Sequence, residues 1–594
     1  MRNVVFKFLC PLLGGMMLLL VFVVSVRESM EPRHGSGASI AGVGLVFYLG
    51  FGILSLGAVL MVVMRVRQPG FFLGHTLTPS TPALTDDAAI ATASHPDAGP
   101  DQHHRALLVE RDTMVEKKVF HNIIGGEIQA TPDGNTMDIV NPSTGEVYAS
   151  APNSSGKDVD DAFTAAAKAF ESWRWSTPSE RQRALLRLAD LIEDNAEELV
   201  ALECENTGKP MSLTMSEEIP PMVDQIRFFA GAARVLEGRS QGEYMRGHTS
   251  SIRREPVGPV AQVAPWNYPM MMAVWKFAPA LAAGCTVVLK PSDSTPASSY
   301  WMVEKMQEIF PPGVCNLVCG DRDTGAALVA HPVPQLVSIT GSTRAGMAVA
   351  ASAANDLKRA HLELGGKAPV VIFNDADIAA AVEGLTAAGY FNAGQDCTAA
   401  TRLIIQDGIY DEFLSAMAES VAGTRTGYDP ADEDILFGPI NNSNQMRHID
   451  GLVSRAPAHA RILAGGKQKD CAGFFYEPTL IVDLQQDDEL IQTEIFGPVV
   501  TAQRFSDEQQ ALFFANGTEY GLASSVWTKD VDTAARMGAR LDFGCVWINT
   551  HIPLVAEMPH GGFKHSGYGK DLSMYGFEDY TRIKHVMHYH GFEG

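Results

Sequence analysis

Hydrophobic and polar residues are arranged differently in the first part of the chain and in the rest. Residues 1–67 hold two long uncharged apolar runs, at 8–26 and 39–64, whereas the later sequence breaks into short apolar runs separated by amphipathic segments. Each long run has the length that a helix needs to cross a bilayer. The pattern therefore predicts a transmembrane helical hairpin at 1–67, ahead of a globular body that begins near residue 119.

Basic residues beside the apolar runs set the predicted orientation. Arg2 and Lys7 precede the first run, and Arg65 and Arg67 follow the second. Because the positive-inside rule counts Lys and Arg, we expect both ends in the cytoplasm and the body anchored to a bacterial inner membrane. The alternative is a cleaved signal peptide followed by a single span. The first run is long for a signal peptide, and no clear A-x-A site closes it.

Residues 68–118 connect the two parts. They are rich in Pro, Ala, Thr and Asp and have no hydrophobic periodicity. Such a composition cannot bury enough apolar surface to fold on its own, so a flexible linker is predicted.

The body alternates between helical and strand patterns. The sequence TPSE at 177–180 is a capping box with Pro at the first helical position, and one continuous helical face is predicted beyond it. That face comprises Leu185, Ala189, Ile192, Ala196 and Leu199. Short buried strands are predicted at 260–264, 286–289, 316–319, 336–340 and 369–373. Strands that alternate with crossover helices indicate an α/β fold with a doubly wound parallel sheet.

Charge and cysteine content exclude several classes of function. The formal net charge of −23, without a Lys/Arg-rich run, argues against nucleic acid as a partner. The 8 cysteines are scattered, and only Cys315 and Cys319 lie close together. No second Cys or His pair completes a zinc site, so no metal is expected. We expect reduced, mostly buried thiols and a reducing compartment.

A glycine-containing turn gives a weak nucleotide signal. The sequence GSTRAG at 341–346 follows a predicted strand and opens a predicted helix, so backbone N–H groups of Gly341, Ser342 and Gly346 are placed to face a phosphate. No Lys-Ser/Thr pair follows Gly346, which excludes a P-loop. A turn of this kind is more often only a turn.

Several motifs in a fixed order carry more information than any one of them. The chain contains PWNYP at 265–269, KPS at 290–292, GSTRAG at 341–346, ELGGK at 363–367, FNAGQDCT at 391–398 and EIFGPV at 494–499. In this order they resemble the aldehyde dehydrogenase superfamily, over roughly residues 119–594. The resemblance implies an NAD(P)-dependent oxidation of an aldehyde to its carboxylate.

A narrower resemblance concerns the substrate. The stretches FFAGAAR at 228–234, EMPHGGFK at 557–564 and SGYGKD at 566–571 look like bacterial gamma-aminobutyraldehyde dehydrogenases. That family oxidises 4-aminobutanal in putrescine breakdown, so 4-aminobutanal or a related aminoaldehyde is the expected substrate. A membrane hairpin is not part of that family's pattern.

The superfamily resemblance also implies a domain plan. A Rossmann-like NAD(P)-binding domain is expected at 119–237 and 257–365, and an α/β catalytic domain at 366–565. A β-arm for oligomerisation and a C-terminal tail are expected at 238–256 and 566–594. A homodimer or homotetramer follows from the resemblance.

The same resemblance assigns the catalytic residues. Cys397 is the expected nucleophile, because an aldehyde carbon must first become a tetrahedral adduct before it releases hydride. The side chain of Asn267 and the backbone N–H of Cys397 are expected to stabilise the oxyanion of that adduct. Glu363 is expected to activate water against the thioester, with a proton relay toward Lys276.

Cofactor contacts carry over in the same way. Trp266 and Ser342 are expected near the pyrophosphate, Lys290 with Ser292 near the adenosine ribose, and Glu494 with Phe496 at the nicotinamide ribose. Many NAD-dependent members have Glu three residues after the lysine, where this chain has the shorter Asp293. The shorter side chain leaves room for a 2′-phosphate, whereas its charge repels one. NAD is the expected cofactor, with NADP left open.

The substrate pocket is expected to hold a cation. Asp396 directly precedes the nucleophile and offers a carboxylate, and Tyr268 and Trp275 offer aromatic faces for an ammonium group. The alternative is that Asp396 only caps the loop that carries Cys397.

Three other functions compete with aminoaldehyde oxidation. A coenzyme-A-acylating dehydrogenase needs no deacylating base, so Glu363 argues against it. A membrane-associated enzyme for long-chain or general aliphatic aldehydes would use the same chemistry on another substrate. A non-catalytic membrane-bound module conflicts with the presence of Cys397, Asn267, Glu363 and Lys290 together.

Overall fold

The computed structural model describes residues 39–40, 43–44, 117–129, 134–429 and 432–591. The chain divides into two compact units, residues 1–111 and residues 112–594. The predicted apolar run 8–26 and the linker up to residue 116 lie outside the described residues. Among the residues that are described, no helix is long and apolar enough to cross a bilayer.

The described part of the first unit corrects the second predicted span. Within 39–64, β1 (Ser39–Ile40) pairs antiparallel with β2 (Val43–Gly44), where a helix was predicted. Gly44 in β2 fits this difference, because glycine loses more backbone freedom in a helix than other residues do. The rest of that run, residues 45–64, lies outside the described residues.

The second unit contains an eight-stranded sheet whose five central strands are parallel. Its order is β24 (Gly567–Tyr568), β14 (Arg359–Leu364), β13 (Leu336–Gly341), β10 (Pro259–Val263), β11 (Thr286–Lys290), β12 (Cys315–Leu317), β4 (Asn122–Ile124) and β5 (Glu127–Gln129). The strands predicted at 260–264, 286–289 and 336–340 are confirmed, while the one predicted at 316–319 begins and ends earlier. β24 joins this sheet although residues 566–594 were predicted to form arm and tail.

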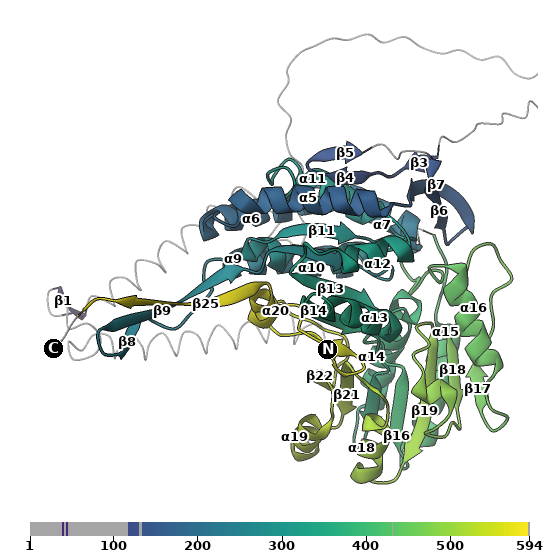
Figure 1. The fold of residues 1–594 in the computed structure, drawn as a ribbon. Helices are drawn as coiled ribbons and strands as arrows, with labels where there is room; N and C mark the ends of the chain where they lie inside the picture. The colour runs from purple at the N-terminus through teal and green to yellow at the C-terminus, as the bar shows by residue number, and fades with distance from the viewer. Residues whose placement is uncertain (1–38, 41–42, 45–116, 130–133, 430–431, 592–594) are drawn as a thin grey trace, which may run out of the picture. The chain divides into compact units, whose positions relative to one another are not determined.

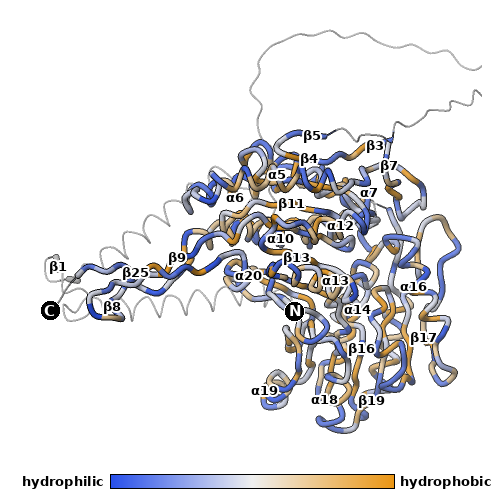
Figure 2. The backbone as a smooth tube through the Cα atoms, viewed as in Figure 1, coloured by the Kyte–Doolittle hydropathy of each residue, from blue (hydrophilic) through white to orange (hydrophobic). Residues whose placement is uncertain are grey.

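Helices cover this sheet and bury its strands (Figure 1). They include α5 (Gly156–Trp173), α10 (Pro269–Ala283), α11 (Ala297–Met306), α12 (Arg322–Ala330) and α13 (Thr343–Ala354). Every residue of β11 is buried, as expected for a central strand with helices on both faces. Figure 2 shows the hydrophobic colouring concentrated in such inner segments.

The predicted long helix is two helices. α6 (Pro178–Asp194) begins with the predicted capping box, in which Thr177 N donates to Glu180 Oε2 at 2.6 Å. The helix ends before Asn195, whose Nδ2 donates to Leu191 O at 2.8 Å, and α7 (Ala196–Thr207) follows. The Asn195 side chain competes with backbone N–H groups for the carbonyl acceptors of the helix, which ends α6 at this point. α8 (Met211–Glu217) and α9 (Ile219–Ala232) continue the chain.

A second, seven-stranded sheet carries the rest of the body. Its order is β17 (Arg461–Ala464), β18 (Thr479–Val482), β19 (Val499–Phe505), β16 (Arg402–Gln406), β15 (Pro369–Ile372), β21 (Ala523–Trp527) and β22 (Cys545–Ile548). Only β17 is antiparallel. Its helices are α14 (Ile378–Tyr390), α15 (Tyr410–Gly423), α16 (Ser443–Ser454), α17 (Glu489–Gln492), α18 (Glu508–Asn516) and α19 (Val531–Arg540). The chain passes from β14 to β15 through residues 365–368.

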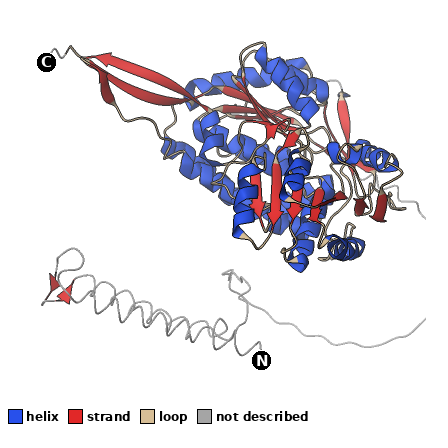
Figure 3. Cartoon of the chain, turned by 90° about the horizontal axis from the view of Figure 1, so that it is seen from below, coloured by secondary structure: helices blue, strands red, loops and turns tan. Residues whose placement is uncertain are grey.

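Three smaller sheets complete the described structure of this unit. β8 (Gly242–Met245), β9 (His248–Pro256) and β25 (Thr581–Tyr589) form an antiparallel arm that projects from the helices of the body (Figures 1 and 3). β3 (Lys118–Val119), β6 (Thr136–Asn141) and β7 (Glu146–Pro152) form another sheet, and β20 (Tyr520–Gly521) pairs with β23 (Phe563–Lys564). The short helix α20 (Ser573–Asp579) precedes β25.

Candidate active site

A cavity of about 1320 Å³ is lined by residues from both large sheets. It runs past the carboxyl ends of β13 and β14, which contribute Gly341 and Glu363, to the loop after α14, which contributes Cys397. Ligand sites of α/β proteins lie at the carboxyl ends of parallel strands. Of the predicted site residues, those that line the cavity are Trp266, Asn267, Tyr268, Trp275, Asp293, Gly341, Ser342, Glu363, Asp396, Cys397, Glu494 and Phe496.

The loop that carries Cys397 is held in an unusual backbone conformation. After α14, Asn392 and Ala393 have φ of 50° and 57°. Asn392 Nδ2 donates to Asn267 O at 2.9 Å, and Asn267 Nδ2 donates to Gln395 O at 3.0 Å. The two asparagines therefore tie the loop before Cys397 to the segment that precedes α10. Backbone strain of this kind is found where the surrounding structure fixes a reactive group.

The thiol of Cys397 lies among carboxylates. Burial, followed by the negative charges of Glu363, Asp396 and Glu494, raises the pKa of Cys397 well above the usual range. Cys397 forms no disulfide, and the raised pKa favours the thiol over the thiolate. Its attack on a carbonyl carbon therefore requires loss of a proton.

Glu363 is buried next to that thiol. It lies near the end of β14, in register with Thr340 of β13 and Gly567 of β24, and is only 1% exposed. Neither of its carboxylate oxygens accepts a hydrogen bond from a described residue. Its Oε1 lies 3.2 Å from Nε2 of His560. A buried carboxylate with so few partners is free to accept a proton in the cavity.

Lys276, the predicted end of a proton relay from Glu363, forms a buried ion pair with Asp571. Its Nζ lies 3.1 Å from Oδ2 of Asp571. His361 Nε2 lies 3.2 Å from the other oxygen of Asp571, and all three residues are buried. Burial raises the pKa of Asp571, but Lys276 and His361 outweigh it and hold that pKa well below its usual range. Asp571 supplies the counter-charge that a buried ammonium needs.

Asp396 caps its own loop. Its Oδ1 accepts hydrogen bonds from Thr398 N at 2.6 Å and Thr398 Oγ1 at 2.7 Å, and its Oδ2 accepts one from Tyr268 Oη at 2.8 Å. Both oxygens are thus engaged within the protein, which favours the capping alternative over an ammonium contact. Trp275 donates its Nε1 to Gln225 Oε1 at 2.9 Å, so its ring position is fixed.

The structure adds acidic residues that the sequence reasoning missed. Glu217 and Glu218, where α8 gives way to α9, line the same cavity. Glu218 is buried and lies 2.6 Å from Lys209 Nζ, whereas Glu217 is exposed. No local pattern marks them, because α8 meets the Cys397 loop only through the tertiary fold.

The histidines of the cavity were missed as well. His551 and His560 both line it. The ring of His551 lies 2.8 Å from Ser525 Oγ and 2.7 Å from Thr398 O. Burial lowers the pKa of His551 to about 4, so this ring is neutral. His560 lies within the stretch EMPHGGFK, which carries part of the family resemblance. That stretch gave no sign that His560 contacts Glu363.

Glu494 and two aromatic rings form the part of the cavity expected to hold the cofactor. The rings of Trp266 and Phe496 meet edge to face, with centroids 5.2 Å apart. Glu494 Oε1 accepts a hydrogen bond from Gly366 N at 2.7 Å. Burial raises the pKa of Glu494 to about 7. A Cβ on Gly365 would lie 2.2 Å from the same carboxylate, so only glycine fits there.

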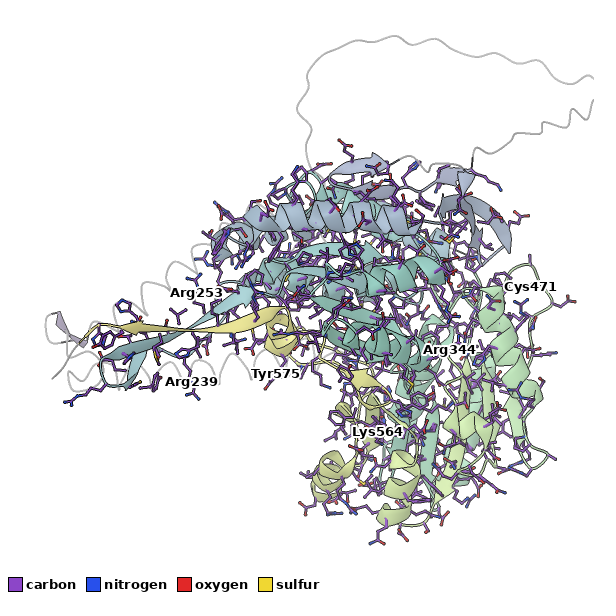
Figure 4. All side chains as sticks on the ribbon, in the orientation of Figure 1. Arg239, Arg253, Arg344, Cys471, Lys564 and Tyr575 are labelled. Atoms are coloured by element: carbon purple, nitrogen blue, oxygen red, sulfur yellow. The ribbon has the colours of Figure 1, made fainter. Side chains whose placement is uncertain are left out.

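Ser342 begins α13 beside the cavity. Its Oγ accepts a hydrogen bond from Ala345 N at 3.3 Å, which makes it the N-cap residue of α13. The first turn of this helix carries Arg344, an exposed cavity residue that is labelled in Figure 4. Gly346 was expected to face a phosphate, but its N–H donates to Ser342 O at 2.9 Å within the helix. A Cβ on Gly346 would lie 2.4 Å from Leu364. Gly346 therefore serves close helix–strand packing.

Lys290 and Ser292 are not among the residues that line the cavity. Lys290 is buried and donates from Nζ to Pro291 O at 2.9 Å. Burial lowers the pKa of Lys290. Ser292 Oγ donates to Asp293 Oδ1 at 2.9 Å, and the exposed Asp293 does line the cavity.

The cysteines other than Cys397 were expected to be buried. Cys204, Cys285, Cys315 and Cys319 are, but Cys545 is partly exposed and Cys471 is exposed, on the surface shown in Figure 4. All seven described cysteines are free.

Comparison with known proteins identifies a family whose members this chain resembles. Residues 129–586 match the model of the aldehyde dehydrogenase family. An aldehyde dehydrogenase of Emericella nidulans is 40% identical over 472 residues, which are 78% of this chain and 94% of that protein. A phenylacetaldehyde dehydrogenase of Pseudomonas fluorescens is 37% identical over 480 residues, 78% of this chain and 95% of that protein.

A solved structure extends the comparison to three dimensions. The crystal structure of betaine aldehyde dehydrogenase from Staphylococcus aureus in complex with NAD+ is 37% identical. It superposes with a TM-score of 0.77 and covers 80% of this chain and 95% of that one.

Proposed function

The chain belongs to the aldehyde dehydrogenase family, and on that premise we propose that Cys397 and Glu363 oxidise an aldehyde to its carboxylate with NAD(P). One observation carries the proposal. An otherwise unbonded, buried carboxylate of Glu363 lies within 4.8 Å of the Cys397 thiol, in a cavity that both large sheets line. Nucleophilic catalysis followed by hydrolysis requires such a pair.

Each residue has a defined task in this reaction. Cys397 releases its proton to solvent, and its sulfur bonds to the aldehyde carbon, whose carbonyl oxygen becomes the oxyanion of a thiohemiacetal. The second hydrogen of Asn267 Nδ2 and the Cys397 N–H stabilise the oxyanion. After oxidation, Glu363 takes a proton from water, and the resulting hydroxide attacks the thioester to release the carboxylate and the Cys397 thiol.

The residues present fit a nicotinamide dinucleotide. Ser342 at the start of α13 offers a helix N-terminus toward a pyrophosphate, and Trp266, Phe496 and Glu494 border the adjoining part of the cavity. When bound, the cofactor accepts the hydride that leaves the carbon. The carboxylate of Asp293 lines the cavity and would repel a 2′-phosphate, so we propose NAD as the preferred cofactor. The guanidinium of Arg344 lines the same cavity and would attract one, so NADP is the second cofactor to assay.

The experiment is a substrate and cofactor panel on the full chain, beside Cys397→Ala. The proposal expects aldehyde-dependent NADH or NADPH formation that the alanine variant lacks, because the variant cannot form the covalent adduct. Cofactor binding, followed by protein fluorescence quenching, should persist in the variant. Activity of Cys397→Ala within tenfold of the unaltered protein would contradict the proposal.

We further propose a cationic aldehyde, 4-aminobutanal or a related aminoaldehyde, as substrate. The carboxylates of Glu217 and Glu218 and the rings of Tyr268 and Trp275 line the cavity. Glu217 is exposed, whereas Glu218 is paired with Lys209, so Glu217 is the carboxylate open to an ammonium group. The resemblance to aminobutyraldehyde dehydrogenases supports the same class.

A membrane anchor is a separate proposal. The predicted apolar run at 8–26, and residues 45–64 that remain of the run predicted at 39–64, have the lengths of bilayer spans. Flanking Arg and Lys residues favour a cytoplasmic body at a bacterial inner membrane. A reporter that is active only outside the cytoplasm, fused after Arg67, should stay silent. Strong reporter activity would contradict this topology. Preference for long-chain over amino-substituted aldehydes in the panel would instead favour a lipid-derived substrate.

Self-association is proposed through the arm. β25 pairs with β9 along nine residues, and Ile583, Val586, Met587 and Tyr589 on it are exposed. A projecting apolar strand is a template for pairing with a second copy. Light scattering should give a homodimer or homotetramer, and a monomer at micromolar concentration would contradict the proposal.

A further inference from the structure

Three different metal-binding side chains converge at the reactive cysteine. Sγ of Cys397, a carboxylate oxygen of Glu363 and a ring nitrogen of His560 all lie within 4.8 Å of one another. Over the part of the chain that the structure describes, no other three His, Cys, Asp or Glu residues meet in this way. These residues are far apart in sequence, so only the fold brings the three ligand types together.

Two of the three side chains lack other partners. Glu363 and His560 have side chains that are 1% and 2% exposed. Neither Glu363 oxygen forms a hydrogen bond with a described residue, and neither does Nδ1 of His560. Unsatisfied buried polar atoms are costly, and a bound ion is one way in which proteins satisfy them. A bound ion would satisfy the atoms of Glu363 and His560 together.

His560 is held in place through its backbone and through its ring. His560 N donates to Asp571 O at 2.9 Å, and Asp571 N donates to His560 O at 2.8 Å. Its ring meets Trp275 edge to face, with centroids 5.1 Å apart. The imidazole therefore stays beside Glu363, with its Nε2 at 3.2 Å from Oε1.

We propose that Cys397, Glu363 and His560 form an inhibitory Zn²⁺ site with a fourth position open to the cavity. A tetrahedral zinc ion with one S, one N and one O ligand holds these atoms about 3.3 to 3.6 Å apart. The His560–Glu363 distance of 3.2 Å already matches. The longest separation, at most 4.8 Å, has to shrink by no more than about 1.2 Å.

The ligand set selects zinc over the common hard cations. Mg²⁺ and Ca²⁺ prefer oxygen ligands alone, whereas Zn²⁺ accepts thiolate, imidazole and carboxylate together. A thiolate and one carboxylate neutralise the ion, and the nearby carboxylates of Asp396 and Glu494 add attraction for a cation. Binding releases the proton of the thiol to solvent. Because the ion would occupy both the nucleophile and the base, it would block turnover reversibly.

Cobalt provides a direct test, because Co²⁺ replaces Zn²⁺ and a cobalt–thiolate bond absorbs in the near ultraviolet. The full chain, freed of metal by chelator, is titrated with Co²⁺ in the absence of aldehyde and cofactor. We expect a thiolate charge-transfer band that saturates at one ion per chain and disappears when Zn²⁺ is added. Absence of the band would overturn the proposal whatever the enzyme activity is.

Variants identify the ligands. His560→Phe keeps a ring against Trp275 and should weaken Zn²⁺ binding at least about tenfold, and Cys397→Ser should abolish the cobalt band. His448→Phe replaces an exposed histidine of the same cavity and should leave the Zn²⁺ affinity unchanged, as should Cys471→Ser. Unchanged affinity in His560→Phe, or loss of the band in Cys471→Ser, would overturn the assignment. Circular dichroism and melting temperature identify any variant that fails to fold, for which His560→Asn is the substitute.

The experiments distinguish failure of the proposed metal site from failure of the proposed aldehyde oxidation. Zn²⁺ should inhibit aldehyde oxidation and protect Cys397 from alkylation, and chelator should reverse both effects. An enzyme that oxidises aldehydes and shows no cobalt–thiolate band refutes only the metal site. A protein with the band and no aldehyde oxidation refutes only the proposed function.

Discussion

The backbone amide of Gly366 donates a hydrogen bond to Oε1 of Glu494 across 2.7 Å. This contact fixes a half-buried carboxylate against residues 365–368, which connect the two large sheets. On its other side, Gly366 approaches the nucleophile loop so closely that a Cβ would lie 2.1 Å from the Cys397 carbonyl oxygen. The glycine thus sets the spacing between Glu494 and Cys397.

Gly366→Ala is expected to reduce turnover by about 100-fold or more, because displacement of a catalytic loop by about 1 Å has effects of that size. Steady-state kinetics of NADH formation measure the loss. Gly538→Ala is the matched control, since a Cβ there meets nothing within 4 Å. Normal turnover in Gly366→Ala would show that the loop tolerates the displacement.

The buried pair of Lys276 and Asp571 should matter for stability. Asp571→Asn leaves the Lys276 ammonium buried without its counter-charge, which costs about 3 to 5 kcal/mol of unfolding free energy. Because the folded pKa of Asp571 is lowered, its stabilisation is present above the unfolded carboxyl pKa of about 3.9 and is lost as pH falls below that value.

Urea unfolding of the full chain measures this loss. The double variant Lys276→Met with Asp571→Asn should lose less than the sum of the single variants, since it leaves no unpaired charge. A loss below about 0.5 kcal/mol in Asp571→Asn, within the range of ordinary surface changes, would argue against a structural pair.

The raised pKa of Cys397 predicts how its reactivity depends on pH. Since the thiolate is the reacting form, the rate of alkylation by iodoacetamide should keep rising through pH 9 without a plateau. The charge of Glu363 contributes to the shift, so Glu363→Gln should move the profile to lower pH. The measurement uses the Cys471→Ser background, because Cys471 is exposed. A plateau below pH 7 would mean that the thiolate is already formed.

Helices and strands were predicted best where the signal comes from residues close together in the sequence. The capping box at Thr177 and the strand-to-helix turn after β13 depend on neighbouring residues, and both are confirmed. The break at Asn195 was missed because Ala196 and Leu199 continue the apolar periodicity across it. Periodicity reports which residues are buried and not whether the backbone hydrogen bonds continue.

Contacts between distant segments were predictable only where family motifs mark them. Cys397, Asn267 and Glu363 meet as the motifs implied, because each lies in a recognisable stretch. His560 and Glu217 reach the same cavity from other elements without a local signal. The ion-pair partner of Lys276 had no local signal either, because the carboxylate at its Nζ belongs to Asp571, which lies 295 residues later in the chain.

Substrate charge can be tested on two carboxylates. Glu217→Gln should raise KM for 4-aminobutanal about tenfold, equivalent to about 1.4 kcal/mol, and leave butanal nearly unchanged. Asp396→Asn should instead affect both aldehydes similarly, because the Asp396 oxygens already accept bonds from Thr398 and Tyr268. Equal losses on both aldehydes in Glu217→Gln would remove the structural support for a cationic substrate.

The most direct test of the account is rapid mixing of Glu363→Gln with aldehyde and NAD. Loss of the Glu363 charge favours the Cys397 thiolate, so oxidation should proceed once, whereas water is no longer activated against the thioester. We predict a burst of about one NADH per active site followed by a steady rate at least about 100-fold below that of the unaltered enzyme. A linear time course at near-normal rate, without a burst, would show that another group is the deacylating base.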